Sequence, residues 1–194
     1  SGTGRVAECT VAQARTLPEK VTVTLSREGE KVVLKAGRSR FTLSSLPATE
    51  FPVIDDIGAK QSIRIAESAA RRLIDKTHFA MAQQDVRYYL NGTLLETQGK
   101  TLRAVATDGH RLSLAEAELA QAVTGTQQVI LPRKGVLELQ RILGNEGEVE
   151  LSIGSNHIRA QVGEIRFTSK LIDGKFPEYG RVIPANPPRT MTAA

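Results

Sequence analysis

The stretch "GEVELSIGSNHIRAQVGEIRFTSKLIDGKFP", from Gly147 to Pro177, repeats in outline a segment near the start of the chain. That earlier segment, from Glu19 to Pro52, reads "EKVTVTLSREGEKVVLKAGRSRFTLSSLPATEFP". Both contain glycine, arginine, phenylalanine and threonine at the same spacing, and both finish in Phe-Pro with one residue of difference in loop length. So many matches in the same order indicate that one structural unit occurs twice in the chain.

Each copy shows the two-residue alternation of a half-buried β-strand. The apolar positions of the first strand in each copy are Val21, Val23, Leu25, Val149, Leu151 and Ile153. The polar stretches "SREGE" and "GSN" follow these strands and have the composition of turns. Each copy is therefore predicted to be an antiparallel meander that ends in an extended Phe-Pro connector.

Helices are predicted before the meanders. The segment 66–79, "AESAARRLIDKTHF", follows the strand "SIRI", and the segment 132–144, "PRKGVLELQRILG", follows the strand "QQVIL". Pro132 suits a first helical turn and Gly144 suits a C-terminal stop. Helical spacing assigns to the inward faces Ala66, Ala69, Ala70, Leu73, Thr77, Val136, Leu139 and Leu143. A further helix, "AECTVAQARTL" at 7–17, is predicted before the first meander.

The segment between the two central helices, 86–119, is predicted to be sheet. The adjacent tyrosines of "RYYL" are expected to face opposite sides of a strand. In "VATDGHRLSL", Asp-Gly predicts a hairpin with Asp108 in the turn and His110 at the start of the return strand. Residues 61–174 then form a strand, a helix and a meander, twice over, while residues 9–50 form half of such a pair, with an unpaired sheet edge. The predicted fold class is α+β, with two helices packed on antiparallel sheets.

The composition is that of a globular protein, with 194 residues, 40% hydrophobic and 24% charged. No membrane span or leader is expected, and the single cysteine, Cys9, excludes an internal disulfide and suits a reducing compartment. We therefore expect a cytoplasmic protein. A net charge of +5 permits a polyanionic partner, and the scarcity of aromatic residues favours contact with phosphates over base stacking.

The sequence "TDGHR" places an acid, a histidine and an arginine together, as an active site would. Catalysis by Asp108 and His110 requires a nucleophile and an orienting group that converge on them, and no second cluster in the sequence supplies one. The three histidines and Cys9 lack the spacing of metal ligands. A turn that also serves binding is the favoured interpretation, with no catalytic residue, no metal and no cofactor expected. An enzyme and a free-standing nucleic-acid-binding module remain the alternatives.

Basic residues gather on both central helices, and an ordinary solvated face would explain most such rows. Arg133 and Lys134, however, lie beside a helix N-terminus, whose dipole already favours anions. Positive side chains beside the positive end of a helix dipole repel it, unless an anion binds between them. Their presence therefore indicates that an anion is expected there.

The motifs "QQDVRYYLNG", "VATDGHRL", "LPRKGV", "IGSNHIRA" and "RFTSKLIDGKFPEYGRV" together resemble the bacterial DNA polymerase III β subunit family, the sliding clamps. The resemblance runs from about Leu17 to the end of the sequence. It implies a ring of two subunits, each with three domains of the DNA-clamp fold, in which helices line the hole and sheets form the outside. It assigns 1–57 to the C-terminal half of the first domain. Within this range, "GTG" at Gly2 to Gly4 has no strand before it, so residues 1–8 are interpreted as a cloning remnant. It assigns 58–183 to the complete middle domain, and 184–194 to a linker and the start of a missing third domain.

The resemblance also implies a function and two sets of site residues. A clamp is a non-catalytic processivity factor that encircles double-stranded DNA without sequence specificity, and a fragment of this kind would be unable to close the ring alone. Polymerase subunits, the clamp loader and repair proteins would dock short linear peptides in a pocket formed by Leu90, Thr107, Gly109, His110, Arg111, Leu112, Pro177, Arg181 and Val182. The residues implied to face DNA are Arg71, Arg72, Lys76, Gln84, Tyr88, Tyr89, Arg133, Lys134 and Arg141.

Overall fold

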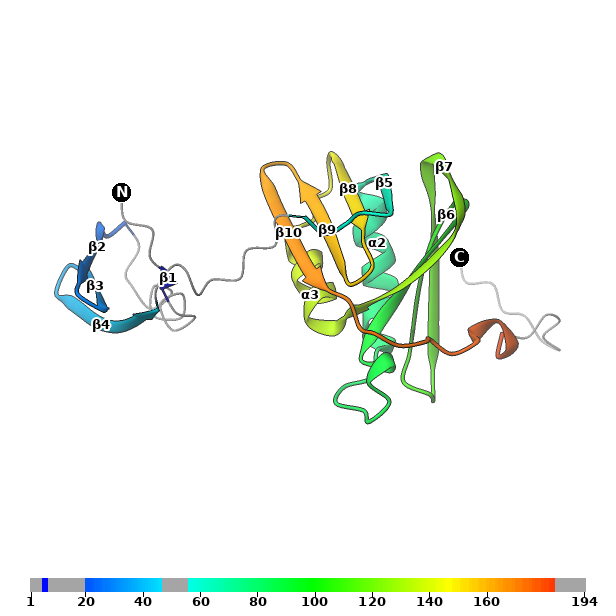
Figure 1. Cartoon of the computed structure of the whole chain (residues 1–194), viewed down its shortest axis with the longest axis horizontal. Coiled ribbons are helices and arrows are strands. Elements are labelled where there is room, and N and C mark those ends of the chain that lie inside the picture. The colour runs from blue at the N-terminus through cyan, green and yellow to red at the C-terminus, as the bar shows by residue number, and fades with distance from the viewer. Residues whose placement is uncertain (1–4, 7–19, 47–55, 184–194) are drawn as a thin grey trace. The chain divides into compact units, whose positions relative to one another are not determined.

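The computed structural model describes residues 5–6, 20–46 and 56–183 (Figure 1). The chain divides into two compact units, residues 1–54 and 55–194. The helix predicted at 7–17, most of the segment 1–8, and the segment 184–194 lie outside the described residues. Within the described ranges, no helix is long and apolar enough to cross a membrane.

The first unit contains a four-stranded antiparallel sheet with the order β1-β4-β3-β2. Its strands are β1 (Arg5–Val6), β2 (Val23–Glu28), β3 (Lys31–Ala36) and β4 (Ser39–Leu46). The predicted meander β2–β3–β4 is confirmed, and β3 is buried at Val32, Val33 and Leu34.

The burial expected for the first strand of this meander is wrong. Val23 and Leu25 of β2 are 45% and 56% exposed, because no helix or second sheet among the described residues of this unit covers them. Alternation in a sequence marks the apolar face of a strand, but that face is buried only where another layer packs on it.

Residues 56–183 of the second unit form two sheets and two α-helices. The four-stranded sheet has the order β10-β9-β8-β5, and a long two-stranded sheet pairs β6 with β7. The elements are β5 (Gln61–Ala66), α2 (Glu67–Thr77), β6 (Gly92–Thr107), β7 (Leu112–Pro132), α3 (Arg133–Ile142), β8 (Glu148–Ile153), β9 (His157–Val162) and β10 (Ile165–Lys170). Three 3₁₀ turns, η2 (His78–Ala80), η3 (Tyr88–Leu90) and η4 (Tyr179–Arg181), complete it.

One apolar core joins these layers. Leu73 and Ile74 of α2, Val136 and Leu139 of α3, and Leu151 of β8 belong to a single cluster of buried side chains. The two helices contact each other, and each packs on strands of both sheets. The α+β prediction with helices packed on antiparallel sheets is therefore confirmed.

The duplication seen in the sequence is present in the backbone. The β3–β4 turn pairs Ala36 with Ser39 around Gly37, and the β9–β10 turn pairs Val162 with Ile165 around a glycine at the matching position. These glycines have φ values of 58° and 53°. A positive φ at the first position of a two-residue hairpin turn favours glycine, which explains why both copies keep it.

The helix predictions are right within two residues at their ends. The first helix ends at Thr77 and continues as η2, and the second runs from Arg133 to Ile142. Ala70, Leu73 and Thr77 are buried as predicted, but Ala66 is exposed at the N-cap.

The strand predicted through "RYYL" is wrong, because the segment turns instead of extending. The backbone N–H of Asp85 donates to Asn91 Oδ1 (3.0 Å), and the Asn91 amide donates back to Asp85 O (2.9 Å). This reciprocal pair closes the loop and directs residues 88–90 into η3. Tyr88 and Tyr89 consequently touch edge to face, with ring centroids 5.8 Å apart, rather than facing opposite sides of a sheet.

Candidate functional site

The connection between β6 and β7 is a four-residue loop whose shape depends on Asp108. Thr107 pairs with Leu112 across the two strands, so the loop is 108–111. Asp108 Oδ1 accepts the backbone N–H groups of His110 (2.9 Å) and Arg111 (3.0 Å). These hydrogen bonds, together with the charge of Arg111, hold the pKa of the Asp108 carboxyl below its ordinary value. Asp108 is thus a turn residue, as predicted.

His110 does not begin the return strand, because that strand starts at Leu112. It is exposed within the loop, and Asp108 bonds to its backbone N–H. The catalytic alternative required a buried pair of side chains that bond to each other, and this arrangement does not supply one. No group of three or more metal-ligating side chains occurs in the described part of the chain.

A second loop supports the turn from the side. Arg87 forms an ion pair with Asp85 (2.8 Å) and donates through Nη2 to the backbone oxygen of Asp108 (3.2 Å). The hydrogen bond from the Arg87 side chain, with a second from its backbone N–H, lowers the pKa of Asp85 to about 2. Gly109 has a φ of 89°, and a Cβ there would approach Arg87 Nη1 to 2.9 Å. Glycine therefore lets the two loops meet closely.

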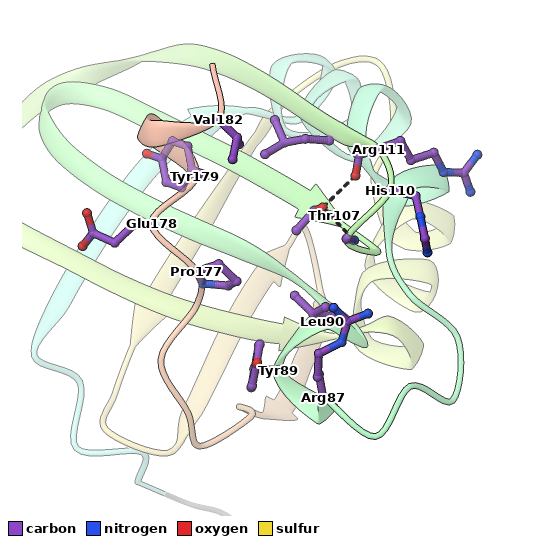
Figure 2. Close-up of a pocket in the computed structure, with 12 residues that line it drawn as sticks. Arg87, Tyr89, Leu90, Thr107, His110, Arg111, Pro177, Glu178, Tyr179 and Val182 are labelled. Carbon is purple, nitrogen blue, oxygen red and sulfur yellow. Dashed lines mark hydrogen bonds between the residues drawn. The ribbon is translucent and has the colours of Figure 1, made fainter. Parts of the chain in front are cut away.

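The chain after β10 forms a third wall. Phe176 is buried against Leu94, Val105 and Ile130 of the β6–β7 sheet. This anchor leads directly into Pro177 and η4, which stand beside the loop 108–111 (Figure 2).

These three segments enclose a cavity of about 450 Å³. Its lining residues are Arg87, Tyr89, Leu90, Thr107, Gly109, His110, Arg111, Leu112, Pro177, Glu178, Tyr179 and Val182 (Figure 2). The pocket residues named from the sequence all lie among them except Arg181, whose exposed side chain approaches Glu178 at 3.9 Å. Leu90 and Thr107 are buried in the floor, and Arg87, His110 and Arg111 are exposed.

Sequence reasoning left Arg87, Glu178 and Tyr179 out of this site and assigned Tyr89 to a DNA-facing surface. All four fall inside the motifs "RYYL" and "FPEYGRV", which had already supplied other residues of this site. Their position in these motifs was therefore a signal that they could line the same cavity. The missing information was the 3₁₀ turn at 88–90, because a strand would have sent one of the two tyrosines away from Leu90.

The other residues expected to face DNA fall into two groups. Gln84, Arg133, Lys134 and Arg141 line one open depression of about 470 Å³ next to the N-terminus of α3. Arg72 and Lys76 are exposed on α2, and Tyr88 is exposed on η3.

Arg71 is tied into the fold. It donates to the Leu143 backbone oxygen (3.3 Å) at the end of α3 and lies 4.0 Å from Asp75. It is therefore less free than its neighbours on α2 to contact a ligand.

Comparison with known proteins gives a consistent result. Residues 64–178 match the family model for the DNA polymerase III beta subunit, central domain. A beta sliding clamp of Pseudomonas aeruginosa is 55% identical over 88% of this chain and 47% of its own length, and one of Escherichia coli is 49% identical over 92% and 49%. The crystal structure of the DNA polymerase III subunit beta from Pseudomonas aeruginosa superposes with a TM-score of 0.83 at 51% identity, covering 95% of this chain and 52% of that one.

The chain therefore spans about half the length of the curated relatives that it matches. The matched family model covers most of the second unit, including β6, β7, both helices and the Phe-Pro connector. On this evidence the chain belongs to the family of DNA polymerase III beta subunits, the beta sliding clamps.

Proposed function

We propose that this chain forms part of a processivity factor of bacterial replication, a cytoplasmic ring that encircles duplex DNA and tethers other proteins to it. The ring would be a homodimer with no catalytic chemistry of its own. We assign 58–183 to its complete middle domain and 1–57 to the C-terminal half of the first. The boundary between the two units at 54 and 55, and the family match at 64–178, support this division.

The observation that carries the proposal is the convergence of three separate motifs on one cavity. "RYYL", "TDGHRL" and "FPEYGRV" lie far apart in the sequence, yet each contributes lining residues to the same 450 Å³ space. A cavity of this size suits a few apolar side chains of a peptide. We propose that polymerase subunits, the clamp loader and repair proteins dock short linear peptides here.

The chemistry of the lining fits such a ligand. The floor offers Leu90 and Leu112 to leucine or aromatic side chains of a peptide, and Gly109 leaves room for its backbone. Arg87, His110 and Arg111 form a polar rim that would orient the peptide without proton transfer.

The basic residues near α3 suit contacts with DNA. Arg133, Lys134 and Arg141 lie in one depression with Gln84, and phosphates are the anions that such cations neutralise without reading sequence. We propose that retention on DNA comes from encirclement, so each contact can be weak. The relatives have about as much sequence again that this chain does not match, and corresponding parts would complete the ring.

The peptide pocket is tested with a labelled short peptide that carries one leucine and one phenylalanine. Leu90→Asp places a charge in the buried floor, and Val182→Glu places one on a lining side chain that is 69% exposed. Both variants should weaken binding at least tenfold, because apolar contact is replaced by a charge that must be desolvated. Fluorescence anisotropy measures the dissociation constants.

Val86→Glu is the matched control for the exposed substitution. Val86 is 94% exposed and is not among the residues that line the cavity, so this variant should bind as the unchanged chain does. Equal binding by Val182→Glu and Val86→Glu, or no binding by the unchanged chain, would show that the pocket assignment is wrong.

A further inference from the structure

A polar cluster around the buried Glu96 adjoins the third wall of the pocket. Tyr179 of η4 donates through its hydroxyl to Glu96 Oε1 (2.7 Å), and Arg103 Nη1 donates to the Tyr179 hydroxyl (2.8 Å). Arg103 also pairs with Glu96 (2.7 Å) and with Glu116 (2.6 Å), and Gln128 donates to Glu96. Glu96 and Arg103 are not among the residues that line the cavity.

An irregularity in β6 brings Glu96 and Arg103 together. Residues seven positions apart on a regular strand point to opposite faces of the sheet. Seven residues of extended strand also span roughly 23 Å, so side-chain atoms 2.7 Å apart require the chain to turn back between the two residues. The turn lies at Gly99, which has a φ of 54° and where the pairing of β6 with β7 shifts. As a result, both side chains reach the same hydroxyl.

The cluster is held tightly by its own chemistry. Glu96 is 6% exposed, and burial alone would raise its pKa, but hydrogen bonds from Gln128 and Tyr179 and the charge of Arg103 keep the pKa below its ordinary value. Burial, together with the hydrogen bond to Glu96, raises the pKa of Tyr179. The carboxylate therefore stays charged and the phenol stays protonated at neutral pH, which favours the hydrogen bond between them.

Tyr179 supplies the polar connection between the pocket wall and the sheet. The backbone hydrogen bonds recorded for 177–183 run within the segment, as from Val182 N–H to Tyr179 O (3.1 Å). Among the described residues, the side-chain hydrogen bonds that leave this segment all pass through the Tyr179 hydroxyl. Phe176 anchors the segment at one end only.

We propose that Tyr179 is a positioning residue for peptide binding, whose hydroxyl, held by Glu96 and Arg103, sets the place of the pocket wall 177–182. The expected effect of Tyr179 on peptide affinity rests on the proposed function. The expected effect of Tyr179 on the position of the wall does not, because it is a property of the unliganded chain.

The experiment uses the 194-residue chain and three variants, Tyr179→Phe, Glu96→Gln and the double variant. Tyr179→Phe keeps the ring and removes the hydroxyl. It should raise the dissociation constant of the labelled peptide by about tenfold. Glu96→Gln keeps an acceptor but loses the charge, so its effect should be smaller. In the double variant, Glu96→Gln should add nothing, because the link is already broken.

Amide hydrogen exchange separates positioning from direct contact. Without peptide, Tyr179→Phe should speed exchange at Arg181 and Val182 at least tenfold, measured relative to the amides of β8 and β9 so that global destabilisation is subtracted. Glu150→Gln is the control, because it breaks an exposed ion pair with Arg64 (3.1 Å) in the same unit and should leave both affinity and exchange at 181–182 unchanged.

Each other outcome contradicts the inference. Lost affinity with unchanged exchange would mean that the hydroxyl touches the peptide itself, and unchanged affinity with unchanged exchange would mean that it positions nothing. If the unchanged chain binds no peptide, the proposed function fails, and the exchange rates at 181–182 alone decide whether Tyr179 holds the wall.

Discussion

Thr93 of β6 is a residue at which the sequence and the fold disagree. Its side chain is buried at 1% exposure, lines a small internal cavity with Leu73 and Val136, and its hydroxyl has no hydrogen-bond partner among the described residues. A buried polar group without a partner lowers stability, since it has given up its hydrogen bonds to water.

Thr93→Val should therefore raise the free energy of unfolding by about 1–2 kcal/mol, because valine has nearly the same shape without the hydroxyl. Urea unfolding followed by circular dichroism measures the change. Thr97→Val is the matched control, since the Thr97 hydroxyl donates to Gln61 Oε1 (2.7 Å) and its removal should lower stability. A Thr93→Val variant that is destabilised as much as the control would contradict the prediction.

At the scale of elements, sequence periodicity predicted both central helices and both meanders but not the loops. Apolar spacing was enough for α2 and α3, because their buried faces repeat every three or four residues. Apolar spacing could not predict the conformation of "RYYL". There, two hydrogen bonds between Asp85 and Asn91 override the strand preference of the tyrosines. The cavity proposed to bind peptides was reached through family motifs, since its three walls come from segments that only the fold brings together.

Buried charges were also beyond sequence reasoning. Glu67 is 8% exposed and accepts the Gly144 backbone N–H (2.6 Å), which joins the start of α2 to the end of α3. Glu96 is the other case. Nothing in the local sequence distinguishes either of them from an exposed glutamate, because burial of a charge depends on partners from distant segments.

The loop that contains Asp85 should respond to acid in a defined range. Its pKa is lowered from 3.8 to about 2 by its hydrogen bonds from Arg87, so the folded loop is stabilised fully above about pH 4. That contribution is lost as the pH falls through about 2. Nuclear magnetic resonance of the folded population should show the amides of Arg87 and Leu90 titrating with a midpoint near 2, and Asp85→Asn should abolish the transition. A midpoint at the ordinary value would contradict the ion pair.

At the scale of the whole molecule, the duplicated meander fits the proposed ring, in which one fold would be repeated. Each repeat keeps the glycine of its second turn, Gly37 or Gly163, while the residues around the peptide cavity and α3 occur in the second unit. The net charge of +5 does not say where the charges lie. The proposed contact with DNA requires that cations gather on the surface that meets it.

The placement of those cations predicts how the chain binds linear duplex DNA. An open part of a clamp has only phosphate contacts, so affinity should be weak at physiological salt, with a dissociation constant of about 10⁻⁴ M or higher, and it should fall linearly on a double-logarithmic salt plot. Arg133→Ala removes a cation from the depression beside α3 and should reduce the slope of that plot by about 1. Arg166→Ala removes an exposed arginine from β10 and should leave the slope unchanged, because the proposed ring would have this sheet on its outside. Tight binding at physiological salt would favour a free-standing DNA-binding module, and equal slopes for the two variants would remove the depression from the DNA-facing surface.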